Sequence, residues 1–370
     1  MKYNLADVCV RLSSGKGIPA KMIESSGRFP VYGGNGLRGY TEQSNFDGEC
    51  AIIGRQGAFC GNVRFFSGKA YMTEHAIVAV ANKDHNTRYL AYLLSTMSLG
   101  HLSAQSAQPG LSVKTLSKVT VDLPSKEEQD KAVNILSRLE DKIAENSKIN
   151  DNLERQATAY FQELFVANAN PNWKTGTISS LGTVIGGSTP SKARPEYYTD
   201  NGIAWITPKD LSINKSKFIS HGETDITELG LKNSSASIMP EGTVLFSSRA
   251  PIGYIAISNG EVTTNQGFKS VVPKPEIGTA FVYFFLKNNL PTIEGTASGS
   301  TFKEVSGSTM KNVPAVIPDT GTLAKFNDFC SPIFNEQKNL EQENQHLASL
   351  RDTLLPKLMS GEIDVSNIQL

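Results

Sequence analysis

Glycine-rich stretches are the first candidates for chemistry in this sequence. Residues 34–39 read GNGLRG after a short strand-like run, which matches the GxGxxG spacing of a dinucleotide-binding loop. No helical pattern follows this stretch, and no acidic residue stands about 20 residues further on, as that kind of site requires. Residues 67–70, SGKA, lack the upstream glycine and the Ser or Thr of a phosphate-binding loop. We therefore interpret residues 34–39 as a glycine-rich turn.

The side chains that usually bind metals or act in catalysis are scattered along the chain. The five histidines form no HExxH motif and no paired ligand spacing; they are His75, His85, His101, His221 and His346. The sequence contains no Asn-Pro-Pro-Tyr-like methyltransferase motif and no nuclease-like group of Pro-Asp and Glu-x-Lys. We expect no catalytic residue, no bound cofactor and no metal in this chain, so it is not predicted to be an enzyme.

Composition places the chain among ordinary soluble proteins. It has 370 residues, enough for two or three domains, of which 39% are hydrophobic and 19% charged. No run approaches the length that spans a membrane, and the first residues start no apolar signal region. The cysteines form no CxxC pair, which predicts buried, reduced thiols in a cytoplasmic protein; they are Cys9, Cys50, Cys60 and Cys330.

A long helix is predicted to start just after Pro124, where Ser125 and Glu128 have the spacing of a capping box. The following residues contain no Gly or Pro up to Phe165 and repeat apolar or Asn residues every 3.5 positions, as a helix that packs along a partner helix does. These residues are Leu136, Ile143, Asn150, Ala157 and Leu164 at a positions and Leu139, Asn146, Leu153 and Tyr160 at d positions.

The same pattern returns 194 residues later, so the partner helix is predicted within the chain. Leu139 and Asn150 correspond to Ile333 and Asn344, and an Asn within the seam of each helix can fix their register. Further d positions of the second helix are Leu340, Leu347 and Leu354.

The segments outside the helices also repeat. Residues 1–123 and 173–320 both show short strand-like runs between glycine-rich turns, with a helix expected near residues 86–94. The matched segments are 5–14 with 178–187 (offset 173), 58–63 with 250–255 (offset 192), 73–75 with 264–266 (offset 191), and Val119 and Pro124 with Val313 and Pro318 (offset 194).

This repeat predicts four segments: a mixed α/β domain at 1–123, a spacer helix at 124–166, a second such domain at 167–320, and a second spacer helix with a C-terminal tail at 321–370. Because domain termini usually lie close together, the two helices are expected to run antiparallel. The predicted fold class is α+β, with two similar mixed α/β domains joined by two long antiparallel coiled-coil helices as a pseudo-twofold internal repeat.

The zero net charge conceals an uneven distribution. Residues 1–125 carry 13 Lys and Arg against 8 Asp and Glu, a net charge of +5. Residues 167–320 carry +1, and each helical segment carries −3. A positive segment is compatible with a surface that faces phosphates, although charge alone is weak support for this interpretation.

The repeat and several strings resemble the specificity subunit of type I restriction–modification systems. The strings are LLPKLMSGEI at 354–363, SRAPIG at 248–253, ITPKDL at 206–211, GLSV at 110–113 and LPSKEEQ at 123–129. They span nearly the whole chain. The first helix departs from the pattern, because it ends QELF at 162–165 without the Pro-Lys-Leu-Met of the second.

The resemblance implies a DNA-binding subunit without catalytic activity of its own. Its expected partners are double-stranded DNA, two modification (methyltransferase) subunits and restriction/translocase subunits. Each target-recognition domain would read one half of a bipartite, asymmetric site for adenine methylation. The helices would set the spacer between the half-sites and dock the modification subunits.

Candidate DNA-binding residues follow from base chemistry within this resemblance. Arg pairs with guanine and Asn or Gln with adenine, while Lys, Ser and Thr commonly hold phosphate. Residues that differ between the two domains are the better specificity candidates. Examples are Asn35, Arg194, and His75, which the sequence match pairs with Gln266 of the second domain. Arg55 and Arg249 recur in similar surroundings and are equally compatible with scaffold or phosphate roles. The candidates are Lys16, Asn35, Arg38, Arg55, Gln56, His75 and Lys114 in the first domain and Thr189, Lys192, Arg194, Lys209, Arg249, Asn265, Gln266 and Lys303 in the second.

Two alternatives stay open at this point. One is the recognition subunit of a related methylating restriction enzyme, or an enzyme whose site the sequence does not reveal. The other is a structural adaptor that binds proteins and not DNA. Binding of random DNA, with and without modification subunits, separates the adaptor from the others.

Overall fold

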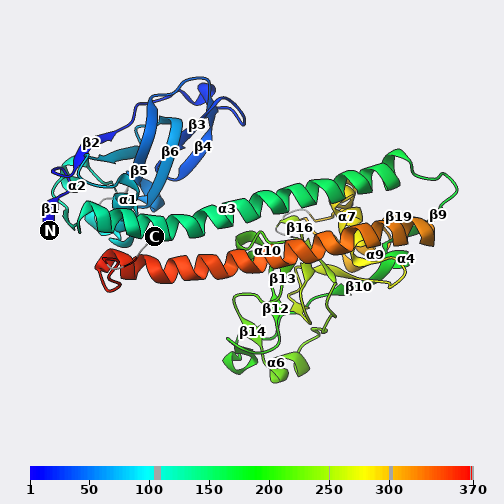
Figure 1. Cartoon of the computed structure of the whole chain (residues 1–370). Helices are drawn as coiled ribbons and strands as arrows, with labels where there is room; N and C mark the ends of the chain where they lie inside the picture. Colours follow the sequence, from blue (N-terminus) through cyan, green and yellow to red (C-terminus); the bar gives the residue numbers. More distant parts are fainter. Residues whose placement is uncertain (104–109, 250, 300–302, 367, 369–370) are drawn as a thin grey trace. The chain divides into compact units, whose positions relative to one another are not determined.

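The computed structural model describes residues 1–103, 110–249, 251–299, 303–366 and 368, and Figure 1 shows the order of its elements. The chain divides into two compact units. Unit 1 consists of Met1–Ile143 and Gln345–Leu370, and unit 2 of Ala144–Asn344. Two long helices, α3 (Lys126–Gln162) and α10 (Thr320–Ser360), each contribute one part to each unit. The segment boundaries predicted from the sequence stay predictions.

The main sheet of unit 1 has the strand order β2-β7-β5-β6-β3-β4. Its neighbouring strands are antiparallel, except that β3 and β6 are parallel. A separate antiparallel pair, β1 with β8, joins the start of the chain to the segment before α3. The strands are β1 (Lys2–Asn4), β2 (Cys9–Ser14), β3 (Phe29–Gly33), β4 (Gly36–Thr41), β5 (Phe46–Gly54), β6 (Val63–Met72), β7 (Ala76–Ala81) and β8 (Thr120–Asp122).

Helix α1 (Thr87–Thr96) packs on the sheet of unit 1, and its residues 89–94 are buried in the larger of the two core clusters there. Leu90 and Leu94 of α1 are buried in one cluster with Ile53 and Ile77 of the sheet. Leu136 of α3, like Leu358 and Met359 of α10, belongs to the same cluster, so both helix ends are part of the core of this domain. Shorter helices of unit 1 are η1 (Ala20–Met22), η2 (Gly57–Phe59), η3 (Leu99–Leu102) and α2 (Val113–Leu116).

The main sheet of unit 2 has the order β10-β18-β15-β16-β13, with only β13 and β16 parallel. Unit 2 also contains three separate two-stranded sheets, which pair β9 with β19, β11 with β14, and β12 with β17. The strands are β9 (Lys174–Thr177), β10 (Gly182–Gly186), β11 (Tyr198–Thr199), β12 (Trp205–Ile206), β13 (Phe218–Ile219), β14 (Asp225–Ile226), β15 (Val244–Ser248), β16 (Ile252–Ser258), β17 (Thr263–Thr264), β18 (Lys269–Pro273) and β19 (Pro314–Ile317).

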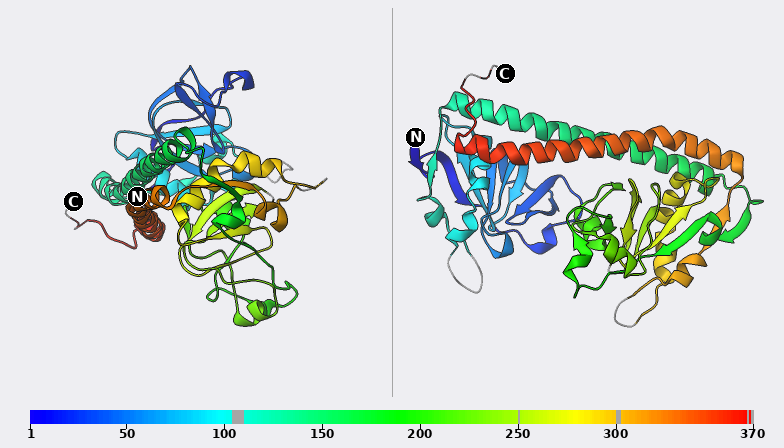
Figure 2. Two further views of the ribbon diagram at one scale, coloured as in Figure 1. Left: turned by 90° about the vertical axis from the view of Figure 1, so that its right-hand side faces the viewer. Right: turned by 90° about the horizontal axis from the view of Figure 1, so that it is seen from below.

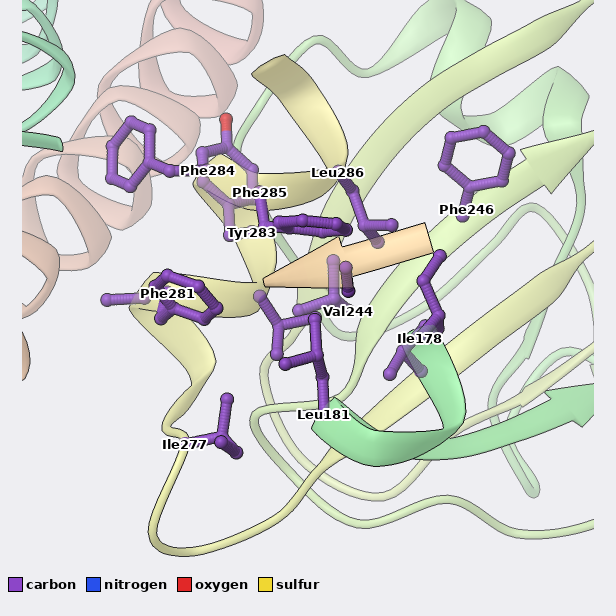
Figure 3. Close-up of a cluster of buried hydrophobic side chains, with 14 of the residues drawn as sticks. Ile178, Leu181, Val244, Phe246, Ile277, Phe281, Tyr283, Phe284, Phe285 and Leu286 are labelled. Atoms are coloured by element: carbon purple, nitrogen blue, oxygen red, sulfur yellow. The ribbon is translucent and has the colours of Figure 1, made fainter. Parts of the chain in front are cut away.

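Helix α7 (Thr279–Asn288) has the place in unit 2 that α1 has in unit 1. Figure 3 shows its residues Phe281 and 283–286 among Ile178, Leu181 and Val244. Phe161 of α3 and Phe326 of α10 join this cluster, with ring centroids 5.8 Å apart. The other helices are η4 (a π-helix, Glu163–Ala167), α4 (Ile178–Leu181), η5 (Pro195–Tyr197), α5 (Pro208–Ile213), α6 (Glu228–Lys232), α8 (Leu290–Gly295) and α9 (Gly307–Lys311).

The predicted repeat is confirmed in the topology of the two domains. The strand order β2-β7-β5-β6 of unit 1 recurs as β10-β18-β15-β16 in unit 2. Leu5 N–H donates to the carbonyl of Val119, and Ile178 N–H to that of Val313, which confirms the offset of 173 at this point.

The offset changes by one residue inside the first repeated strand. Gly187 matches Gly15 and not Ser14, because a β-bulge lies between Cys9 and Arg11 of β2. Such a bulge inserts one residue into a strand. Ser14 therefore pairs with Ile77 where Gly186 pairs with Lys269.

The two long helices lie side by side and antiparallel within each unit (Figures 1 and 2). In unit 2, Asn146 donates to the side-chain oxygen of Asn344 at 3.0 Å, and the ring of Tyr160 lies 4.5 Å from that of Phe329. Contacts in α10 thus move backward along the sequence as those in α3 move forward, which confirms the antiparallel prediction. The buried Asn146 bonds to Asn344, whereas the sequence offset matches Asn344 with Asn150.

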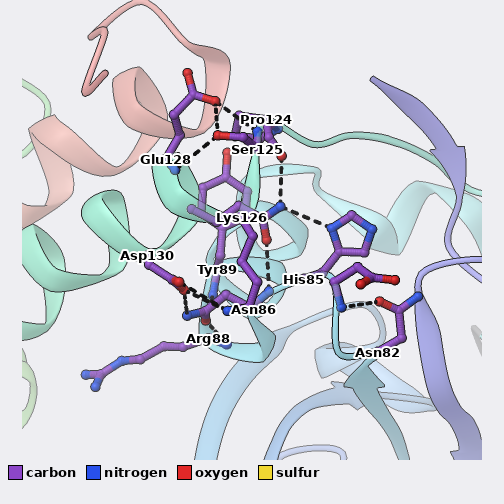
Figure 4. A network of polar contacts seen from close by, with 12 residues as sticks. Asn82, His85, Asn86, Arg88, Tyr89, Pro124, Ser125, Lys126, Glu128 and Asp130 are labelled. Atoms are coloured by element: carbon purple, nitrogen blue, oxygen red, sulfur yellow. Dashed lines mark hydrogen bonds and ion pairs between the residues drawn. The ribbon is translucent and has the colours of Figure 1, made fainter. Parts of the chain in front are cut away.

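Side chains cap the start of each long helix. The capping box predicted for α3 is confirmed: the Ser125 N–H donates to Glu128 at 2.9 Å, and the Glu128 N–H donates to the Ser125 hydroxyl at 3.3 Å (Figure 4). At α10, Asp319 accepts from the N–H of Thr322 at 2.9 Å. Equivalent positions are therefore capped by different chemistry.

Other local predictions have mixed outcomes. The glycine-rich turn predicted at 34–39 is confirmed only for its first residues, which form the turn of the β3–β4 hairpin, because residues 36–39 belong to strand β4. Gly36 has a φ of +98° that favours glycine. All four cysteines are free thiols, but only Cys50 and Cys330 are fully buried, whereas Cys9 and Cys60 are half-buried. Among the residues described, no helix has the length and apolar character needed to cross a membrane.

Candidate nucleic-acid interface

Loops of unit 1 meet through close backbone contacts at one end of β5 and β7. A Cβ atom on Gly15 would lie 2.1 Å from the carbonyl oxygen of Met72, and one on Gly34 would lie 2.8 Å from that of His75. The Arg55 N–H also donates to the carbonyl of His75 at 3.0 Å. These contacts gather residues 15–17, 33–38, 54–56 and 73–75, which we name the first loop cluster.

Six of the seven residues proposed for the first domain lie in the first loop cluster. The Nδ1 of His75 lies 3.0 Å from Oε1 of Gln56, and its Nε2 lies 3.3 Å from Oε1 of Glu74. Arg55 donates to the carbonyl of Glu74 at 3.4 Å. The remaining members are exposed and available to a ligand: Lys16, Asn35 and Arg38.

The seventh residue, Lys114, lies next to the cluster and not within it. It is exposed on α2, whose N-cap Ser112 accepts from the N–H of Thr115 at 3.0 Å. The segment before α2 pairs with the cluster, since the Leu111 N–H donates to the carbonyl of Arg55 at 2.8 Å.

The corresponding loops of unit 2 surround an open cavity of about 740 Å³, which we name the second loop cluster. Six of the eight residues proposed for the second domain line it. The lining residues are Thr189, Lys192, Tyr198, Trp205, Thr207, Pro208, Lys209, Asp210, Glu223, Thr224, Arg249, Asn265, Gln266 and Gly267.

Internal hydrogen bonds orient the polar side chains of this cavity. Asn265 accepts from the N–H of Gly267 at 2.8 Å, and the Thr189 hydroxyl donates to the amide oxygen of Gln266. Lys209 is paired with Glu223, and this hydrogen bond raises the pKa of the lysine. Both amide-bearing side chains can still present hydrogen-bonding atoms to a ligand.

The other two residues proposed for the second domain lie outside the cavity lining. Arg194 is exposed and lies 3.6 Å from Glu196. Lys303 is exposed, and it directly precedes Glu304, whose carboxylate lies 3.8 Å from the guanidinium of Arg249. Arg194 thus lies two residues from the lining residue Lys192, and Lys303 is next to a residue that contacts the lining residue Arg249.

Sequence reasoning missed the aromatic and acidic part of the cavity. The indole of Trp205 donates to the carbonyl of Ser188 at 3.0 Å, and its ring lies 5.7 Å from that of Tyr198. The motif at 206–211 could have indicated Asp210, because its carboxylate completes a capping box with Thr207. No sequence signal pointed to Glu223 or Glu304, since only the fold brings them to the cations.

Such a set of side chains suits reading of DNA. Arg, Asn and Gln form paired hydrogen bonds to base edges, and exposed Lys and Thr suit phosphate oxygens. Within the part of the chain that the structure describes, no group of His, Cys, Asp or Glu could hold a metal ion.

Comparisons with known proteins agree with this chemistry. The family model "Type I restriction modification DNA specificity domain" matches residues 1–155 and 170–347. The type I restriction enzyme MjaIX specificity subunit of Methanocaldococcus jannaschii is 37% identical over 192 residues, which are 51% of this chain and 44% of that protein. The chain thus spans less than half the length of that relative.

Two further relatives cover more of the chain. The type I restriction enzyme HindI specificity subunit of Haemophilus influenzae is 24% identical over 330 residues, 69% of this chain and 71% of that protein. The crystal structure of a type I restriction–modification S subunit from M. genitalium shares the fold, with a TM-score of 0.64, 16% identity and coverage of 97% of this chain and 95% of that one. Because the family model covers most of the sequence in two copies, the chain belongs to the type I restriction modification DNA specificity family.

Proposed function

We propose that this chain is the DNA-recognition subunit of a type I restriction–modification complex and has no catalytic activity of its own. It binds double-stranded DNA, two modification subunits and, in the complete nuclease, restriction/translocase subunits. Each domain reads one half of a bipartite, asymmetric site in cytoplasmic DNA.

The observation that carries this proposal is the gathering of base-reading side chains at equivalent loops of two similar domains. Arg249, Asn265 and Gln266 line one cavity in unit 2, and Arg55 and Gln56 lie in the first loop cluster. A protein adaptor has no need for Arg and amide side chains at both places. Family membership supports the same assignment.

A binding experiment tests the first part of the proposal. The purified chain, with and without the modification subunits, is titrated with a short random-sequence duplex at several salt concentrations. We expect binding that weakens steeply with salt, because phosphate contacts release counterions. Absence of DNA binding in both forms would leave the protein adaptor as the better interpretation. Methyl transfer by the chain without any partner would contradict the non-catalytic role.

Half-site reading is tested by exchanging one domain. Replacing residues 1–123 with the equivalent domain of a relative should change one half-site and leave the other intact. Methylation mapping of the complex with the chimera decides this, and altered bases in both half-sites would show that the domains do not read independently.

The spacer role of the helices has a quantitative test. Lengthening α3 and α10 by seven residues each at equivalent places keeps the heptad pattern and adds roughly 10 Å. At about 3.4 Å per base pair, the preferred spacer should grow by about three base pairs. Activity should also fall, because three base pairs rotate the half-sites by roughly 100° relative to each other. Methylation of a library of sites with varied spacers measures both effects.

A further inference from the structure

Glu304 is the feature of the second loop cluster that fits DNA binding least. Its carboxylate lies 3.8 Å from Arg249 and 3.4 Å from Lys269. Arg249 lines the cavity, and the ammonium of Lys269 also donates to the carbonyl of Gln266 at 3.4 Å. One carboxylate thus neutralises two cations on a face that is proposed to meet a polyanion.

The backbone at this place does not need the carboxylate. Glu304 forms a β-bridge with Arg249, and its counterpart in unit 1, Gly110, forms the same bridge with Gln56. The next residue donates to the strand-end loop in both units, Val305 to Ser248 and Leu111 to Arg55. Since unit 1 builds the same local fold with a glycine, the side chain of Glu304 has a task other than shaping the loop.

The position of Glu304 is well defined. Its N–H and carbonyl exchange hydrogen bonds with Ser298 at 2.9 and 3.1 Å, and the neighbouring Val305 is fully buried. The side chain is 37% exposed and Arg249 is 36% exposed, so both are at the surface that a ligand reaches. A carboxylate fixed at this surface repels phosphate oxygens that approach the same cations.

We infer that Glu304 is a specificity residue of the second domain, which keeps Arg249 from holding DNA phosphates and so reserves it for a base of the correct half-site. The inference rests on the proposed DNA-binding function. Phosphate contacts bind any sequence, whereas an arginine that pairs with a guanine edge contributes only at the right base. Occupying the arginine with a weak, half-exposed ion pair lowers affinity for random DNA at little cost to the specific complex.

The inference is tested with the variant Glu304→Gln, which preserves the size of the side chain and removes its charge. We expect this variant to bind random-sequence DNA more tightly than the unchanged chain. Affinity of the full chain for a random-sequence duplex should rise about fivefold to tenfold at low salt, and the salt dependence should steepen by about 0.9 for each additional phosphate that the protein neutralises. The thermal midpoint of the variant checks that its fold is intact, so that tighter binding is not caused by basic residues exposed on misfolding.

Matched variants assign the effect to Arg249. Glu228→Gln removes the same charge from α6, where Glu228 lies 3.9 Å from Lys232, and should leave affinity unchanged. In the double variant Arg249→Gln with Glu304→Gln, the increase in affinity should disappear, because the freed cation is gone. An increase that persists in the double variant would overturn the assignment to Arg249.

The remaining outcomes separate the inference from the proposed function. If the unchanged chain binds random DNA and Glu304→Gln binds it equally or more weakly, the inference is wrong and the function stands. Loss of preference at one base without tighter binding to random DNA would also overturn it, because Glu304 would then accept a hydrogen bond from cytosine directly. If neither protein binds DNA, the proposed function itself fails.

Discussion

The domain of unit 1 is joined to α3 by a half-exposed ion pair. Arg88 of α1 donates to Glu140 at 2.6 Å, and the Tyr92 hydroxyl donates to the same carboxylate at 2.6 Å. The guanidinium also lies 4.9 Å from the ring centroid of Phe65. Side-chain exposures of 21% for Arg88 and 30% for Glu140 leave this group within reach of water.

Unit 2 uses a buried cation for the corresponding task. Lys217 is only 6% exposed; its ammonium pairs with Glu154 of α3 and donates to Gln337 of α10 at 2.6 Å. It lies 4.2 Å from the ring centroid of Phe334, with two further aromatic rings close by. Glu341 accepts the backbone N–H of Lys217 at 2.8 Å.

Burial shifts the pKa values of the charged residues in this second group. It lowers the pKa of Lys217, and the charge of Glu154 offsets this effect only in part. Burial also raises the pKa of Glu341, against the two backbone N–H groups that it accepts. A buried charge of this kind persists only with close partners.

The difference between the units lies in the segment that carries the cation. Arg88 belongs to α1, which has a counterpart in α7, whereas Lys217 lies in the stretch between β10 and β15 that also supplies cavity residues such as Lys209. In unit 1 the equivalent stretch forms the β3–β4 hairpin at the sheet edge. This stretch of unit 2, which differs from its counterpart in unit 1, is thus anchored to α3 and α10 within that unit.

The largest expected effect is from Lys217→Met. Losing the ammonium leaves the half-buried Glu154 with Lys287 alone as its charged partner, at 2.6 Å. We expect unit 2 to lose about 3 kcal/mol of unfolding free energy, at the lower end of the range for a broken buried pair. Urea unfolding followed by the emission of Trp173 and Trp205, both in unit 2, measures this loss.

A neighbouring lysine provides the control for that experiment. Lys215→Met changes an exposed side chain two residues away and should cost no more than about 0.5 kcal/mol. Adding Glu154→Gln to Lys217→Met should recover part of the loss, because residue 154 then no longer carries a charge that has lost Lys217 as its partner. Equal effects of the two lysine variants would contradict the interpretation that the buried Lys217 anchors its segment to α3 and α10.

Arg88→Met should have a smaller effect in unit 1. The lost ion pair and cation–π contact are partly solvated, so we expect about 1–2 kcal/mol. Arg138→Met, which changes an exposed arginine of the same helix pair, is the matched control and should be nearly neutral. Circular dichroism melts compare the two variants, and a loss for Arg88→Met as large as that for Lys217→Met would remove the distinction between the units.

The repeated parts of the fold were predictable from sequence because they follow local rules. Heptad spacing predicted α3 and α10, and the spacing of Ser125 and Glu128 predicted the start of α3. The bulge in β2 was not predictable, because nothing in residues 9–11 distinguishes an extra residue from a regular strand.

The candidate sites were predictable to the extent that residue type and loop position indicate them. Asn265 and Gln266 were found because the sequence match at an offset of 191 aligns them with Glu74 and His75. The structure moves this match by one residue: Ala76 N–H donates to the carbonyl of Thr73 where Phe268 N–H donates to that of Asn265, so the offset is 192 and Gln266 corresponds to Glu74. Glu304 and Lys217 were missed, since their partners lie far away in sequence: Lys217 and Glu154 are 63 residues apart. Long-range pairing of charges has no periodicity that a single sequence displays.

The smallest expected effect concerns the caps of the two long helices. The N–H and hydroxyl of Thr322, together with the indole of Trp173, stabilise the charged form of Asp319 and hold its pKa at about 2. An unfolded Asp titrates near 3.9. Between about pH 4 and pH 2 the unfolded chain therefore binds more protons, so this cap stabilises unit 2 fully above pH 4 and loses its contribution as pH falls toward 2.

Asp319→Asn removes the titration while keeping a good N-cap residue. In a Trp205→Phe background, Trp173 is the remaining indole and its Nε1 lies 3.0 Å from Asp319, so its emission reports this group. We expect an emission change with a midpoint near pH 2 that is absent from Asp319→Asn, and a shallower fall of unfolding free energy between pH 4 and 2. Glu128→Gln in unit 1 should leave the Trp173 emission unchanged, because the α3 cap has no tryptophan partner. Identical emission curves for Asp319→Asn and its parent would mean that the α10 cap does not depend on this charge, and the two caps would then differ in residue type alone.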